Sequence, residues 1–332
     1  MLRIRHGWLV VMLAVSAVSA CKKDEKSDPS ATAAGPGGAK ASSASAAADD
    51  LSLLPVDAEL VVGINASQIQ QSALWKQLVE PAMEKARAQH KMTKVNDIKD
   101  KCGFDPTTEV KSIAIGLKGF DSAKPDGVIV VHGLDKTKSI ACFDKMKDDI
   151  AAQGSEVTHD GDVTLVKDKT GETVGIAFVN DSTGVIVVGS KATVAGVKTV
   201  IAGGSGLKTS PAFVAMYSKV KSSDSVWFLG SGALMDKASA IGAKPQGLFG
   251  SLNVTDGLTL DTSLKFETAD AAAQVASKLK GQSQMAVAMV DKIDITSEAE
   301  IAKISVVLSN QKLQALVTQV GAMFGLGGLV GK

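Results

Sequence analysis

From Leu51 onward, short runs of β-forming residues alternate with amphipathic helical segments, and this alternation is what most constrains the fold. Runs rich in β-branched residues predict strands over residues 59–65, 111–117 and 127–132. Residues 135–153 are predicted to form a helix, because apolar side chains recur there at helical spacing (Ile140, Phe143, Met146 and Ile150). Strands mixed with helices in this way indicate an α+β fold.

Turn and cap signals mark further elements. A meander of antiparallel strands is expected after that helix, because three turn sequences follow it: Asp160-Gly161, residues 169–171 and residues 181–184. Helix starts are predicted from cap residues: Ser67 with Gln70 as a capping box, Ser190 before a helix ending near Gly203, and Ser210 followed by Pro211.

The same series of elements then starts again. Three later segments correspond in order to three earlier ones: residues 225–229 to 59–65, the strand after Asp256-Gly257 to the strand after Asp126-Gly127, and residues 306–309 to 187–190. Chance similarity is the alternative explanation. We predict two tandem repeats, 51–205 and 206–332, each a mostly antiparallel sheet with helices packed on one face. The two sheets could be continuous or could face each other.

Residues 1–20 have the order of an export signal. Arg3 and Arg5 precede an almost wholly apolar run, Gly7 to Ala20, which ends in small residues. An uncleaved membrane anchor is the alternative, but a helix over that run would extend about 21 Å, against roughly 30 Å of hydrocarbon. We therefore predict that residues 1–20 are a cleaved signal peptide.

The residues Val18-Ser19-Ala20-Cys21 resemble the lipobox of bacterial lipoprotein precursors. The resemblance implies that Cys21 is lipidated on its thiol and becomes the new N-terminus; ordinary secretory cleavage is the alternative. Several acyl chains would hold such a protein firmly on a membrane. Lys22 stands where the family's inner-membrane retention signal would have Asp, so the resemblance implies the outer membrane, facing the periplasm or the cell surface.

Residues 22–50 contain no Val, Ile, Leu, Met or aromatic residue. Such a segment cannot bury enough apolar surface to offset its ordering entropy, so the segment from Cys21 to residue 50 is predicted to be a disordered tether. As a flexible coil it would hold the domain on the order of 30 Å from the bilayer. A partner-binding segment is the alternative.

Cys102 and Cys142 are the cysteines that remain once Cys21 is lipidated. Two thiols in an exported protein are more often a structural bridge than a site, so a Cys102–Cys142 disulfide is predicted. It would contribute roughly 4 kcal/mol in the chain-entropy model. Neither cysteine belongs to a CxxC motif, which leaves redox catalysis without support.

Composition argues against charged partners. After loss of the signal, 34 basic residues face 35 acidic ones, and Arg87 is the single remaining arginine. Nucleic-acid binding, which needs a basic patch, is therefore not expected. No metal site is expected either, because the histidines His90, His132 and His159 are isolated and lack zinc-ligand spacing.

Three possible catalytic signatures fail on their own spacing. Residues 203–209 (GGSGLKT) lack the Gly before Lys of a phosphate loop, and Gly230-Ser231-Gly232 is not G-x-S-x-G. Asp160-Gly161-Asp162 lacks the further oxygen ligands of a calcium loop. We therefore predict that the protein is not an enzyme and uses no cofactor.

The C-terminal run GAMFGLGGLVGK is apolar but holds five glycines. A helix over residues 311–323 is predicted to stop by Phe324, because glycine disfavours helix. The rest of the Gly-rich tail could dock into a groove of the domain, fray, or face a partner.

Three sequence patterns, LPxDA at 54–58, SxLW at 72–75 and CGFDP at 102–106, resemble uncharacterised Gram-negative lipoproteins with a tethered α+β domain. That resemblance carries no known activity. We expect a non-enzymatic envelope lipoprotein, a binding or structural module with an envelope protein as possible partner. The alternative is a carrier of a lipid or other hydrophobic ligand, and a hydrolase assembled from distant residues is the third possibility. An apolar cavity of roughly 300 Å³ or more would favour the carrier.

Overall fold

The computed structural model describes residues 50–88, 93–119, 122, 124–204, 206–284 and 286–315. The predicted signal peptide, Cys21, almost all of the predicted tether and the Gly-rich tail lie outside the described residues. None of the helices in the described part combines the length and the apolar character that crossing a bilayer requires.

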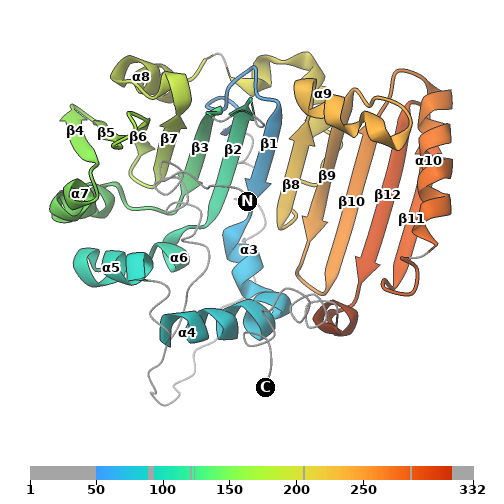
Figure 1. Ribbon diagram of the computed structural model, residues 1–332, viewed down its shortest axis with the longest axis horizontal. Helices are drawn as coiled ribbons and strands as arrows, with labels where there is room; N and C mark the ends of the chain where they lie inside the picture. Colours follow the sequence, from blue (N-terminus) through green and yellow to red (C-terminus); the bar gives the residue numbers. More distant parts are fainter. Residues whose placement is uncertain are drawn as a thin grey trace, which may run out of the picture.

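A single antiparallel sheet of 12 strands organises the described chain (Figure 1). Its order is β11-β12-β10-β9-β8-β1-β2-β3-β7-β6-β5-β4. The strands are β1 (Leu60–Ile64), β2 (Ser112–Lys118), β3 (Asp126–His132), β4 (Glu156–Asp160), β5 (Val163–Lys167), β6 (Thr173–Asn180), β7 (Thr183–Val188), β8 (Val226–Gly230), β9 (Gly247–Asn253), β10 (Leu258–Lys265), β11 (Lys292–Glu298) and β12 (Ile301–Leu308). The α+β class and the antiparallel pairing are confirmed.

The middle of the sheet is the pair β1 and β8, in which Leu60 lies opposite Gly230 and Ile64 opposite Val226. From this seam the strands run β1-β2-β3-β7-β6 in one direction and β8-β9-β10-β12-β11 in the other. The first half adds the hairpin β5-β4 at its edge. Of the two arrangements that the sequence left open, continuous sheets or facing sheets, the structure has one continuous sheet.

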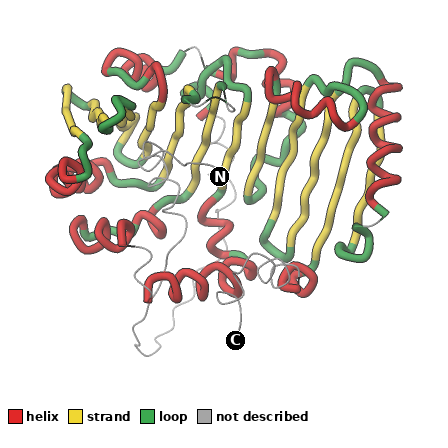
Figure 2. Tube along the Cα trace, in the orientation of Figure 1, coloured by secondary structure: helices red, strands yellow, loops and turns green. Residues whose placement is uncertain are grey.

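The α-helices are α3 (Ala66–Gln71), α4 (Glu80–Ala88), α5 (Thr93–Cys102), α6 (Pro106–Glu109), α7 (Lys136–Ala152), α8 (Val194–Ala202), α9 (Pro211–Tyr217) and α10 (Ala269–Ser283). Four further segments are helical with a different pitch: η1 (Trp75–Val79) is a π-helix, and η2 (Gly189–Lys191), η3 (Leu207–Thr209) and η4 (Gly232–Ile241) are 3₁₀ helices. Figure 2 shows the strands side by side across the centre, with helices around the margins of the sheet.

Helices cover both faces of the first half, so the expectation of helices on one face is wrong there. Ala177 and Gly175 of β6 point to the face where Val197 of α8 packs, while Ile176 between them points to the face covered by α7. The physical reason is the strand composition. The central residues of β3, from Gly127 to Val131, are buried in succession, and a strand apolar on both faces needs cover on both.

In the second half, α10 packs against β11 and β12. Its Ala272 and Val275 are buried with Leu264 of β10 and Ile295 of β11 in a separate core cluster. The opposite face of these strands carries polar residues, since Asp261 accepts a hydrogen bond from Ser305 there at 2.8 Å. Apolar and polar residues therefore alternate along these strands, as in an antiparallel sheet with one face exposed to solvent.

Two predicted caps are wrong by two or three residues. Asn65, not Ser67, caps α3, since its side chain accepts a hydrogen bond from the backbone N–H of Gln68. Thr193, not Ser190, caps α8, and Ser190 instead donates to Asp126 at 2.9 Å. In each case a nearby residue that can also accept from the backbone takes the cap position. The predicted start at Ser210-Pro211 is confirmed, since Ser210 caps α9. Asp135, predicted as the first residue of a helix, is the cap that precedes α7.

Candidate functional site

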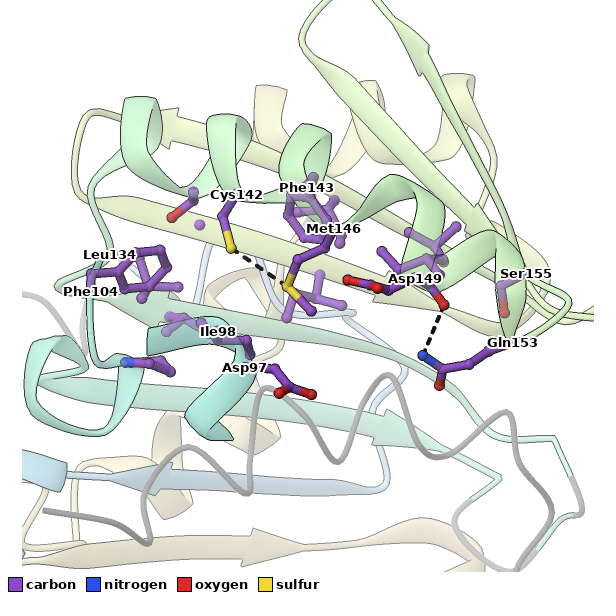
Figure 3. A pocket seen from close by; sticks show the side chains of 18 of the residues that line it. Asp97, Ile98, Phe104, Leu134, Cys142, Phe143, Met146, Asp149, Gln153 and Ser155 are labelled. Carbon is purple, nitrogen blue, oxygen red and sulfur yellow. Dashed lines mark hydrogen bonds between the residues drawn. The ribbon is translucent and has the colours of Figure 1, made fainter. Parts of the chain in front are cut away.

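A cavity of about 560 Å³ lies between α7 and the strands β3, β5, β6 and β7, with α5 and α6 on its outer side (Figure 3). Its wall is mostly apolar. The helix contributes Phe143, Met146 and Ile150, and the sheet contributes residues such as Val131, Val166, Ile176 and Ile186. A volume in this range, lined by apolar side chains with a few polar groups, is typical of small-molecule binding sites.

The helix α7 forms one long side of the cavity and is the helix predicted over 135–153. Asp135 Oδ1 accepts from the backbone N–H of Lys138 at 2.8 Å and starts the helix. Gly154 follows it with φ of 80°, a conformation that favours glycine and ends the helix. The side chains of Phe143, Met146 and Ile150 follow at helical spacing and therefore face the sheet together.

The sheet side is shaped by a glycine. In the β6–β7 ladder, Gly184 lies opposite Phe178, and Ile186 lies opposite Ile176. A Cβ added at Gly184 would meet the Phe178 ring at 3.5 Å, an ordinary contact distance. The missing side chain at Gly184 therefore leaves space that an apolar residue could fill.

The outer wall is held in place by the disulfide. Cys102 at the end of α5 is bonded to Cys142 in α7, with the two Cα atoms 5.0 Å apart, as predicted. The preceding residue in α5, Lys101, forms an ion pair with Asp149 of α7. Asp105 then caps α6 by accepting from the backbone N–H of Thr107 at 3.0 Å and also pairs with Arg87 at 3.2 Å. These links hold α5 and α6 beside the cavity.

The cavity has a buried end and an exposed end. At the start of α7, Ser139 and Cys142 are buried, as are Val110 and Val131 beside them. At the end of α7, Asp149 keeps 43% of its side chain exposed, and Gln153 is exposed. Figure 3 shows Leu134 and Phe104 at one end of the site and Gln153 and Ser155 at the other.

Two polar oxygen atoms in the wall lack partners. Within the described part of the chain, Ser139 Oγ and Asp168 Oδ2 are both buried and make no hydrogen bond. The other carboxylate oxygen, Asp168 Oδ1, accepts from Thr170 N at 2.8 Å, Thr170 Oγ1 at 2.7 Å and Glu172 N at 2.9 Å. Both atoms have almost no accessible surface although the cavity is empty, so they lie behind its wall and do not border its open space.

Asp168 is ionised at neutral pH. Burial raises the pKa of its carboxyl, but hydrogen bonds from Thr170 and Glu172 and the positive charge of Lys124 outweigh burial, so the pKa lies below its usual value. The cavity wall therefore holds a negative charge beside an apolar space.

The residues that sequence analysis considered for chemistry are scattered. His132 Nε2 lies 2.7 Å from Asp50 Oδ1, and His159 lies 3.5 Å from Asp144, both away from the cavity lining. His90 lies outside the described residues. In the described ranges, no group of three or more His, Cys, Asp or Glu residues is arranged to hold a metal ion.

The three rejected motifs also occupy ordinary structural positions. Gly203 ends α8 with φ of 67°, and residues 207–209 form the short turn η3. Gly230 ends β8, and Gly232 starts η4. Asp160 and Asp162 flank a hairpin turn and pair with Lys198 and Lys136 respectively.

Sequence reasoning found α7 and the cysteine pair but missed the cavity. The spacing of Phe143, Met146 and Ile150 predicts an inward-facing helix and does not tell whether the space it faces is filled. Asp168 was missed because it lies beside a sequence that predicts only a turn. Its signal is an acidic residue directly after the apolar strand β5, which many ordinary turns share.

Comparisons with protein-family models, with curated proteins and with solved structures found no match to this chain.

Proposed function

We propose that this protein is a non-enzymatic lipoprotein of the outer membrane whose α+β domain binds a hydrophobic ligand in the cavity beside α7. The single observation that carries the binding role is the apolar cavity of about 560 Å³. The anchoring role rests on the lipobox resemblance at Cys21, with acyl chains holding the chain on a membrane. A carrier on a flexible tether would collect or deliver its ligand near that membrane.

The internal repeat is part of this proposal. Its support is that the strands follow the same order outward from the β1–β8 seam, β1-β2-β3-β7-β6 on one side and β8-β9-β10-β12-β11 on the other. In each half a helix also follows the third strand, α7 after β3 and α10 after β10. The two halves differ in the region of the cavity that we propose as the binding site. The first half has the additional β4–β5 hairpin, and Val166 of β5 lines the cavity.

The binding role is tested by filling the cavity. Gly184→Leu should place an apolar side chain in the cavity without a backbone clash, since nothing lies closer than 3.5 Å to the new Cβ. The probe is 1-N-phenylnaphthylamine, a neutral apolar fluorophore. We expect the unchanged chain to bind it and to gain several degrees in melting temperature at saturating probe, and Gly184→Leu to lose at least about tenfold in affinity.

The matched control is Val179→Leu, which enlarges an apolar side chain on the same strand as Phe178, 41% exposed and outside the cavity lining. All chains carry Cys21→Ser, which removes the acylation position, and are kept in solution by the same amphipathic polymer. Equal probe affinity in the unchanged chain and in Gly184→Leu would contradict the binding role, as would the absence of any binding.

A further inference from the structure

We propose that residues 316–332, which follow the last described residue, fold back and pack their apolar side chains on a row of half-exposed apolar residues in the middle of the sheet. The contact covers a part of the sheet that lies between α7 at one side and α10 at the other (Figure 1).

The row crosses five neighbouring strands at the end of the sheet where β1 and β12 finish. Ile64 lies opposite Val226, and Val226 lies opposite Leu252. Leu252 lies in turn opposite Leu260, and Leu260 lies opposite Val306. Residues directly opposite each other point to the same face of a sheet, and we call these five residues the apolar row. Each of them is only partly buried, so a continuous strip of aliphatic surface remains accessible.

The opposite face of the same strands is covered. Val61, Trp227 and Phe249 point there, and none of them is more than 4% exposed, because they belong to one core cluster. β1 and β8 are therefore apolar on both faces. A face that stays in contact with water in an antiparallel sheet is normally polar, so the apolar row needs a cover of its own.

Residues 316–332 have the composition for this role. They hold nine apolar residues and a single charged side chain, Lys332. Residues 22–49 contain no Val, Ile, Leu, Met or aromatic residue, and residues 1–20 are predicted to be removed. The internal gaps between the described ranges hold at most four residues each. Burial of apolar surface on both partners drives the contact.

The described chain ends at the same end of the sheet as the apolar row. A helix begins at Asn310, directly after β12, and its Leu313 is 6% exposed. Gln314 donates a hydrogen bond to Gln77 of η1, which follows β1 and α3. The row spans four strand spacings, about 19 Å. The 17 residues from 316 to 332 reach up to about 56 Å when extended, so they can cross the row and turn.

A narrow occupant fits this position better than a second copy. Leu264 of β10, on the same face as Leu260, packs with α10. On the other side, Ile64 lies opposite Ile113, and Ile113 lies opposite Val131 of the cavity wall under α7. A helix is about 10 Å thick, which equals the spacing of two packed sheets. The sheet of a second copy would therefore meet α7 and α10 before it reached the row, whereas a single segment can lie between them.

The test replaces Phe324 by p-benzoylphenylalanine, a photo-cross-linking aromatic residue, in the Cys21→Ser full chain described above. Irradiation followed by peptide mass spectrometry identifies its neighbours. We expect cross-links within one chain to β8, β9 or β10 at the apolar row. Leu260→Asp should lower their yield at least about fivefold, because it places a charge in the contact. The matched control, Thr259→Asp, places the same charge on the other face of β10 and should leave the yield unchanged.

Cross-links to the opposite face, to a second copy or to no part of the sheet would overturn the assignment, as would a yield that Leu260→Asp leaves unchanged. A second measurement does not depend on changing the sheet. Phe324→Asp should lower the melting temperature by several degrees, because the row loses its cover, whereas Gln319→Asp adds the same charge to a polar position and should not. Equal melting temperatures in these two variants would also count against the contact. Circular dichroism spectra that match the unchanged chain show that each variant is folded.

Discussion

At the residue scale, the central seam depends on a glycine beneath an indole ring. Gly63 of β1 lies opposite Trp227 of β8, and Trp227 is 3% exposed. A Cβ at Gly63 would lie 2.1 Å from the Trp227 ring, far inside contact distance. The ring itself packs edge-on against Tyr217 with centroids 5.1 Å apart, so it has little space into which to move.

Gly63→Ala is therefore expected to lower the free energy of unfolding by about 1–3 kcal/mol, the usual cost of overpacking a core. Urea unfolding followed by circular dichroism measures it. The double variant Gly63→Ala with Trp227→Leu separates the cause: in the Trp227→Leu background the alanine should cost much less. A cost that is the same in both backgrounds would show that the indole contact is not responsible.

At the element scale, α5 depends on links to α7 more than on its own sequence. Its residues are mostly polar, TKVNDIKDKC, and Val95 and Ile98 are its apolar side chains. Val95 packs with Trp75 and Met83, and Ile98 lines the cavity. Without the bond to Cys142, few apolar contacts would hold this helix over the cavity.

Replacing Cys102 and Cys142 together by serine should lower the free energy of unfolding by about 2–4 kcal/mol, because the unfolded chain regains the freedom of the 40-residue loop. The phenylnaphthylamine affinity should fall as well, since α5 forms the outer wall. Urea unfolding and probe titration measure the two effects. Lys101→Met is the control, because it removes only the exposed ion pair to Asp149 and should change stability little. Unchanged probe affinity in the double serine variant would show that α5 stays in place without the bond.

Some secondary-structure elements could be predicted from the sequence and others could not. The strands β1, β2 and β3 and the helix α7 were predicted because their apolar spacing is regular and their boundaries carry Gly, Asp or Ser. No strand was assigned to β9, with the sequence GLFGSLN, or to β11, with KIDITSE. β9 contains two glycines, and β11 is mostly polar, so each depends on neighbouring strands for its structure.

At the scale of the whole molecule, neither the single sheet nor the cavity could be predicted. The pairing of β1 with β8 depends on which edges meet in three dimensions, and no local pattern encodes it. The cavity lies between α7 and the sheet, and its lining combines residues of α5, α7 and four strands that are far apart in the sequence. Sequence periodicity identifies the faces of these elements and leaves their separation open.

The molecule should lose stability in acid. Hydrogen bonds from Lys118 to Asp57 and from Lys221 to Asp261 hold the pKa of each carboxyl below its usual value. A carboxyl whose pKa is lower in the folded state stabilises the fold fully above its ordinary pKa, and this contribution disappears as the pH falls through the lowered value. We expect the free energy of unfolding to decrease between about pH 5 and pH 2.

Asp261→Asn tests the sign of this effect. The variant should be less stable than the unchanged chain at pH 7, and the two should converge as the pH falls, because protonation already removes the charge of Asp261. Urea unfolding at a series of pH values gives both curves. Two parallel curves would mean that the Lys221–Asp261 pair does not contribute to the acid sensitivity.

The β1–β8 seam has a consequence for the order in which the chain assembles. β1 gains its first neighbour early, from β2, but its second neighbour is a strand that is synthesised only after β7, α8 and α9. Until β8 arrives, one side of β1 offers unpaired backbone groups to any extended segment, including the β8 of another copy. Incomplete chains at high concentration can therefore exchange halves with one another before their own β8 is in place.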